Sequence, residues 1–158
     1  MSKLTTPVLE ALCGQVTRER YSSAVYLTLA CFCDERNLPG FAKWHRARSC
    51  EEMGHAQKLI DYILDRDGQV CVDTINAPDC SCFNVLETFT TALEHERKVS
   101  HNIEELASVA LRANDLTTFT FMGWFLLEQV EEEKTLEEII ARYQLEGGPS
   151  LLEKELGS

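Results

Sequence analysis

The sequence predicts an all-α protein: one domain over residues 1–158, folded as a four-helix bundle with one long crossover and a short fifth helix at its C-terminal end. Three observations predict this. Four long stretches carry almost no Gly or Pro and repeat apolar residues near helical spacing. Two of the connections between them are short, and one is long. A chain of 158 residues also fits one domain with a sizeable core.

The first helix is expected over about residues 6–36. Apart from Pro7 at its start and Gly14, this stretch has no Gly or Pro. The run Asn-Leu-Pro-Gly at 37–40 breaks it. Gly68 is the predicted C-terminal stop of the second helix. The later helices are expected at about residues 41–67, 84–113, 116–145 and 150–156.

The connections predict the topology. The first two helices are joined by about four residues, so we expect them to be antiparallel neighbours, and the same holds for the third and fourth. The stretch 69–83 between the second and third helices has no sustained helical pattern. Its roughly 15 residues reach about 50 Å when extended, against about 45 Å for a helix of about 30 residues. This loop can therefore run the full length of the bundle.

Composition and charge limit the classes of function that this chain can have. A net charge of -11 argues against nucleic acid and membrane surfaces as partners, since both attract Lys and Arg, and it suits a protein that attracts cations. No run of about 18 apolar residues is present to span a membrane, and the N-terminus does not resemble a signal peptide. The seven cysteines form no C-x-x-C motif. We therefore expect reduced thiols and a cytoplasmic protein.

A set of acidic side chains and one imidazole falls at a common level of the predicted bundle. Glu19, Glu52, Glu96 and Glu132 each lie about 12 to 16 residues into a different helix, near mid-height. His55 follows Glu52 at i+3, so the two share one face. Buried, unpaired carboxylates are unfavourable, and their repulsion raises their pKa values. A pair of divalent cations would relieve both problems.

The ligand types indicate which metal binds. Oxygen ligands with one imidazole suit iron or manganese, and zinc also binds such sites. Di-iron bundles typically combine one Glu from each of two helices with Glu-x-x-His from each of the other two. Here Glu52 and His55 form one such motif, but the stretch from Gln129 to Glu132 replaces the second. We therefore expect one tight iron position and one weaker position.

The chain resembles the ferritins from Leu9 to about Leu156. The YSS and EQVEEEK segments are most similar to bacterial non-haem ferritins, whereas NLPGFAKW is similar to animal and plant ferritins. The segments that carry the resemblance are QVTRERYSSAVYL (15–27), NLPGFAKWHRARSCEEMGHAQKLIDYI (37–63), LEHERKVSHNIEELASVA (93–110) and FLLEQVEEEK (125–134).

The resemblance implies roles for individual residues. The first iron position would use Glu19, Glu52 and His55. The second would use Glu52 as a bridge, with Glu96 and Glu132. Gln129 matches a glutamine beside the site, and Tyr26 matches a tyrosine that can supply an electron. A third iron position, found in bacterial ferritins, would use carboxylates matching Glu51, Glu128, Glu131 and Glu132.

The same resemblance implies a function. We expect an iron storage protein with ferroxidase activity, which oxidises Fe(II) with dioxygen or hydrogen peroxide and stores ferric mineral in a homo-oligomeric shell of 24 copies. The missing second His places the chain with the non-haem group, so no haem is expected, although Met53 lies where bacterioferritins carry the haem-binding methionine. Phe119 and Met122 match positions that carry pore carboxylates in animal ferritins, which puts the usual route of iron in doubt.

Three alternatives stay open at this point. The chain could be a di-iron oxidase or oxygenase acting on an organic substrate, which would require a pocket beside the metals. It could be a haem-containing variant similar to the bacterioferritins. It could also be a non-catalytic subunit that only lines a mineral cavity, but such subunits lose ferroxidase ligands, and this chain retains them.

Overall fold

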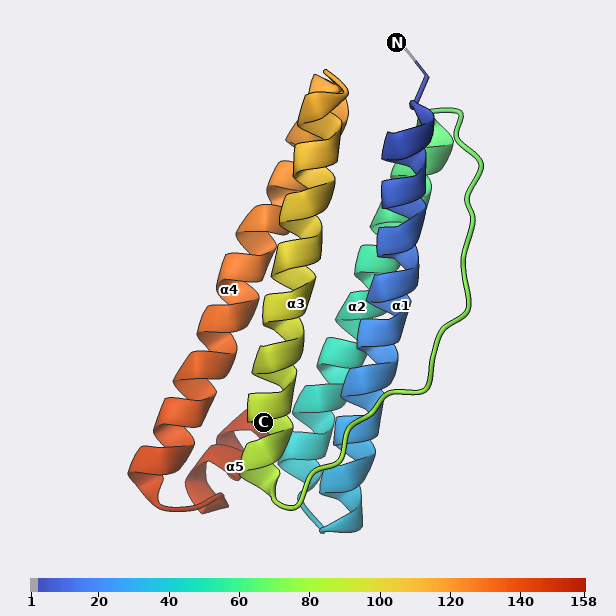
Figure 1. The fold of residues 1–158 in the computed structure, drawn as a ribbon. Helices are drawn as coiled ribbons and strands as arrows, with labels where there is room; N and C mark the ends of the chain where they lie inside the picture. Colours follow the sequence, from blue (N-terminus) through green and yellow to red (C-terminus); the bar gives the residue numbers. More distant parts are fainter. Residues whose placement is uncertain (1–2) are drawn as a thin grey trace.

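The structure is a computed structural model that describes residues 3–158. Within this range, four long helices lie side by side and a short fifth helix crosses one end of the bundle (Figure 1). The helices are α1 (Thr6–Glu35), α2 (Pro39–Asp65), α3 (Val85–Arg112), α4 (Leu116–Glu146) and α5 (Ser150–Gly157). The predicted all-α class and the order of the elements are confirmed.

Helices α1 and α2 form one antiparallel hairpin, and α3 and α4 form another (Figure 1). The crossover between α2 and α3 runs beside α1 from one end of the bundle to the other, as its length predicts. Two contacts fix its first part: the Cys71 N–H donates to Cys13 Sγ at 3.3 Å, and the Asp73 N–H donates to Thr17 Oγ1 at 3.1 Å. α5 packs mainly on α2. None of the described helices is long and apolar enough to cross a membrane.

Two predicted boundaries of the second helix differ from the structure. α2 begins at Pro39, inside the run that we expected to separate the first two helices. Pro is tolerated at the first helical position because the N–H that it lacks would have no helical partner there. α2 ends at Asp65, and Asp67 at φ 54, not Gly68, adopts the left-handed conformation after it. Gly68 instead allows a close approach, because an added Cβ would lie 2.7 Å from Ile63 Cγ2.

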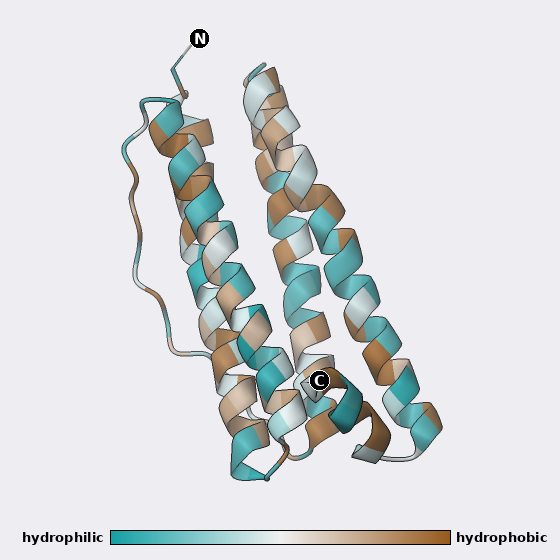
Figure 2. Ribbon diagram, turned by 180° about the vertical axis from the view of Figure 1, so that it is seen from behind, coloured by the Kyte–Doolittle hydropathy of each residue, from teal (hydrophilic) through white to brown (hydrophobic). Residues whose placement is uncertain are grey.

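The apolar core is divided by a polar layer. One apolar cluster surrounds Leu12 and Ile63 near the start of α1, and a second surrounds Leu29 and Phe41 near the α1–α2 turn. Figure 2 shows hydrophobic residues near both ends of the bundle and in α5. Between the clusters, the buried positions are polar on every long helix. They include Glu19, Ser22 and Ser23 on α1, Ser49, Glu52 and His55 on α2, Glu96 on α3, and Gln129 and Glu132 on α4.

Candidate metal centre

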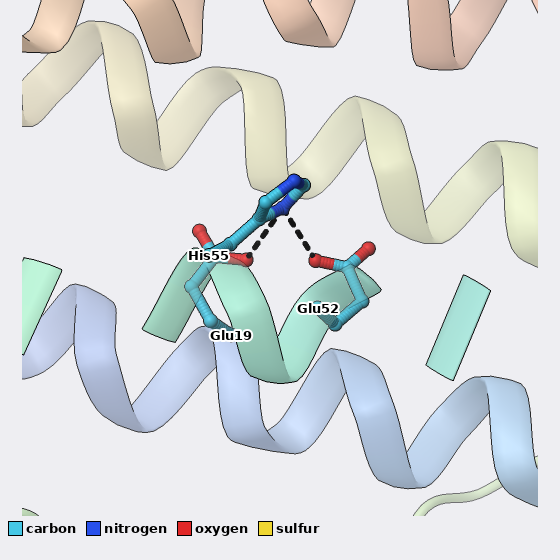
Figure 3. Close-up of side chains that lie close together, drawn as sticks. All are labelled: Glu19, Glu52 and His55. Carbon is cyan, nitrogen blue, oxygen red and sulfur yellow. Dashed lines mark hydrogen bonds and ion pairs between the residues drawn. The ribbon is translucent and has the colours of Figure 1, made fainter. Parts of the chain in front are cut away.

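The hairpin of α1 and α2 brings three predicted ligands together. Glu19, Glu52 and His55 are all buried, and one potential ligand atom from each lies within 4.8 Å of the others. His55 Nδ1 lies 3.0 Å from Glu52 Oε2 and 3.9 Å from Glu19 Oε2 (Figure 3). The i, i+3 spacing on α2 accounts for the first contact, and the packing of α1 along α2 accounts for the second.

The two carboxylates of this group are electrostatically costly. Burial, followed by the neighbouring Glu52, raises the pKa of Glu19 well above its usual range. Burial, followed by Glu96, raises the pKa of Glu52 to about 8. Gln15 Nε2 donates to Glu19 Oε1 at 2.7 Å, but Glu19 Oε2 is buried without a hydrogen-bond partner. A cation bound here would replace the protons that these acids otherwise retain.

Glu96 extends the centre onto α3. It is fully buried, and both of its carboxylate oxygens accept hydrogen bonds. Tyr26 Oη donates to Oε1 at 2.6 Å, and Gln129 Nε2 donates to Oε2 at 3.0 Å. Gln129 also donates to Ser100 Oγ at 3.2 Å. Burial, followed by the charge of Glu96, raises the pKa of Tyr26 well above its usual range, so the phenol keeps its proton.

Helix α4 closes the centre from the other side. Ligand atoms of His55, Glu128 and Glu132 lie within 4.8 Å of one another and form a second group that shares the imidazole with the first. Glu132 is only 3% exposed and pairs with Arg48 of α2. Sequence reasoning missed Arg48, although it precedes Glu52 by one turn on the same face of α2. It also missed Gln15, the hydrogen-bond partner of Glu19.

Comparison with known proteins places this arrangement in a family. A family model described as the ferritin-like domain matches residues 9–145.

The chain belongs to the ferritin family.

Its relatives are ferritins of the non-haem type. The bacterial non-heme ferritin of Staphylococcus epidermidis is 38% identical over 134 residues, which cover 85% of this chain and 81% of that protein. The Staphylococcus aureus counterpart is 35% identical over 159 residues, covering 98% and 96%. The open pore ferritin of the archaeon Archaeoglobus fulgidus has a TM-score of 0.95 at 34% identity, with 99% and 98% coverage. This chain is therefore a non-haem ferritin subunit, as its sequence suggests, and its family is one of iron storage.

The residues expected to form a third iron position in this ferritin are divided in the structure. Glu128 and Glu132 lie beside His55, so this part of the set includes an imidazole that we did not expect. Glu51 is exposed and pairs with Arg48 at 2.6 Å. Glu131 is also exposed, and its carboxylate belongs to neither potential metal group of the described residues. The third position stays a prediction.

One of the two positions that were matched to pore carboxylates lies in the core. Met122 of this ferritin is fully buried in the first apolar cluster, between α1, α2 and α3, so its side chain cannot line a pore. Phe119, three residues earlier and therefore rotated around α4, is 38% exposed and reaches the surface. Met53, at the haem-ligand position of the bacterioferritins, is 41% exposed.

Proposed function

We propose that this ferritin subunit binds two Fe(II) ions at its mid-bundle centre and oxidises them. The observation that carries the proposal is charge: one buried layer holds a carboxylate from each of four helices, and Arg48 is the one guanidinium that contacts them among the described residues. Arg48 offsets only one of the four negative charges of Glu19, Glu52, Glu96 and Glu132, and divalent cations would offset the rest. Carboxylate oxygens with a single imidazole suit iron.

The contacts support roles for several of these residues. Glu52 lies against both His55 and Glu96, so it is the carboxylate best placed to bridge two ions. Glu19 and His55 complete the first position, and Glu96 and Glu132 complete the second. Gln129 and Tyr26 hold the two oxygens of Glu96 by hydrogen bonds and so orient it. Tyr26, hydrogen-bonded to the proposed ligand Glu96, would be a source of an additional electron. Each pair of ferrous ions supplies two electrons, which dioxygen or hydrogen peroxide accepts.

An opening beside His55 supports access to this centre. A pocket of about 540 Å³ between α2 and α4 is lined by His55, Glu51, Asp61, Lys58 and Trp124, among others. Its two carboxylates favour a cation over an anion near the imidazole. Because the pocket is open and partly charged, it suits a small hydrated ion better than an organic substrate. Iron storage therefore remains preferred over oxidation of an organic molecule.

The proposal includes a shell of 24 copies in the cytoplasm that collects the ferric product as mineral. Large apolar side chains are exposed on the single subunit, and contacts between copies in a shell would cover them. Those on the long helices include Leu27, Leu64, Leu111, Leu127 and Val130. Light scattering near the monomer mass at neutral pH would contradict the shell.

The test is aerobic addition of Fe(II) to the assembled protein, followed by stopped-flow absorbance and size exclusion. We expect a fast oxidation phase and stable ferric absorbance that elutes with the shell. Glu52→Ala removes a ligand from both positions and should abolish the fast phase. Glu138→Ala, at an exposed position on α4, is the matched control and should retain it. A fast phase that survives in folded Glu52→Ala protein would refute the di-iron assignment.

A further inference from the structure

Arg48 brings a fixed positive charge into the centre. Its Nη2 contacts Glu132 Oε2, and its Nη1 lies 2.6 Å from Glu51 Oε2. The guanidinium thus joins a carboxylate that is almost fully buried to one whose side chain is 50% exposed, while the Arg48 side chain itself is 17% exposed. Its charge also lowers the pKa of the nearby Glu52 and Tyr26, against the larger effect of burial.

This contact conflicts with a full centre. An arginine stays protonated throughout the pH range of a folded protein, so Glu132, a proposed ligand of the second iron position, has a permanent cation at one of its two carboxylate oxygens. With two Fe(II) ions bound, the four carboxylates would already be neutralised, and Glu132 would no longer need the charge of Arg48. A second ion therefore competes with the guanidinium for Glu132. The first position has no such competitor, because neither Glu19 nor Glu52 forms an ion pair with an arginine in the described chain.

Resting on the function proposed above, we propose that Arg48 is an internal competitor that holds Glu132 until the second metal ion displaces it. Glu51 provides the alternative partner, because it can retain the guanidinium at the exposed side of α2 after Glu132 is released. The two iron positions then fill in order, first at Glu19, Glu52 and His55, and later at Glu96 and Glu132. Arg48 is a positioning residue, and Glu51 is the carboxylate that holds it.

The experiment is an anaerobic titration of the metal-free assembled protein with Co(II), followed by calorimetry and visible absorbance. Co(II) reports coordination without being oxidised. Arg48→Gln removes the charge and should tighten the second binding step about fivefold, which corresponds to one ordinary ion pair lost. The first step should stay within twofold. Arg48→Lys keeps the charge and should resemble the native protein.

Two further variants complete the design. Glu51→Gln removes the alternative partner, so Arg48 should hold Glu132 more firmly and the second step should weaken severalfold. Arg46→Gln is the matched control, because Arg46 lies on the same helix and pairs with the exposed Asp34 outside the centre. It should change neither step.

The outcomes separate this inference from the proposed function. If native protein binds two Co(II) ions but Arg48→Gln leaves the second step unchanged or weaker, Arg48 does not compete with the metal and the inference fails alone. If folded native protein binds no Co(II) at all, the di-iron function fails as well. Tightening in Arg48→Gln together with weakening in Glu51→Gln supports the displacement.

Discussion

Two polar clusters between the helices of this bundle have opposite charge balances. At the end where α2 stops and α4 begins, Arg66 pairs with Asp115 at 3.1 Å, and Tyr62 Oη lies 2.8 Å from Thr118 Oγ1. This Arg66–Asp115 cluster has one charge of each sign. The metal centre has four carboxylates against one guanidinium. The first cluster is complete within the protein, whereas the second is complete only with added cations.

The pKa values reflect this difference. Burial alone would raise the pKa of Asp115, but hydrogen bonds from the Thr118 backbone and from Arg66 outweigh it, so the pKa is lowered. In the metal centre, burial and neighbouring carboxylates act together, and the pKa values of Glu19 and Glu52 rise. A carboxylate that accepts enough hydrogen bonds from the protein therefore stays charged. A buried carboxylate that lacks such donors keeps its proton and can exchange it for a metal ion.

The largest expected effect follows from Glu19→Gln. The variant should lose Co(II) or Fe(II) affinity at the first position by at least about a hundredfold, since even residues that only support a ligand contribute about 10- to 100-fold. The metal-free fold should be as stable as before or more stable, because one buried acid is removed. Calorimetry and thermal unfolding measure the two effects. A strong loss of metal-free stability would mean that Glu19 belongs to a self-sufficient cluster after all.

Asp115→Ala should show the reverse pattern. It leaves Arg66 without its carboxylate and removes the side chain that accepts a hydrogen bond from the Thr118 N–H at the start of α4. We expect a loss of about 3 to 5 kcal/mol in the free energy of unfolding. Metal affinity should not change. Denaturant unfolding and a Co(II) titration on the same sample would test this, and a coupled loss of metal binding would contradict the independence of the two clusters.

The clusters should also differ in pH dependence. The pKa of Glu52 is near 4.5 ordinarily and about 8 in the fold, so between these values the folded state binds more protons. Stability of the metal-free protein should therefore fall as pH rises from about 5 to about 8. Glu19, Glu96, His55 and Arg48 are the charged and titratable groups that face Glu52. The lowered pKa of Asp115 has the opposite sign, and its contribution is lost only as pH falls below its ordinary value of 3.8.

Thermal unfolding of the metal-free protein across this pH range measures the slope, which is how steeply its stability falls with pH. Saturating Zn(II) should abolish it, because the bound ions replace the protons. Glu52→Gln should flatten it without metal. A slope that is unchanged by both treatments would place its origin outside the centre.

Tyr26→Phe should have the smallest effect. The substitution removes the hydrogen bond to Glu96 but keeps the ring, so metal-free stability should change by about 1 kcal/mol. Binding of the first metal ion should not change. The oxidation rate, followed by stopped-flow absorbance over several turnovers, should shift by about fivefold, since 1 kcal/mol in a barrier has about this effect. Identical kinetics would reduce Tyr26 to a packing residue.

The fold could be predicted because its signals are local. Long stretches with almost no Gly or Pro, and connections of unequal length, specify the helices and the topology. The level of the centre could be predicted because Glu19, Glu52, Glu96 and Glu132 are equally far into their helices. The helix ends were harder. Asn37, Asp67 and Asn114 all adopt positive φ after a helix, and an Asn or Asp in a sequence carries that signal far less clearly than a Gly.

The contact of Arg48 with the metal centre could not be predicted either, and the reason is different. An arginine among the polar residues of a helix usually lies in solvent, and its direction depends on how α4 packs beside α2. The sequence also cannot distinguish Glu128, which the structure brings to His55, from Glu131, which it leaves exposed. The two differ by three residues on one helix, and only the rotation of α4 about its axis separates them.

The long crossover has a consequence for assembly of the centre within one chain. It divides the polypeptide into two hairpins of local contacts, so each can form before the other is in place. Glu19, Glu52 and His55 belong to the first hairpin, whereas Glu96, Gln129 and Glu132 belong to the second. A chain cleaved within the crossover would thus separate half of the centre from the other half. The ability to bind a second metal ion would then report that the two halves have docked.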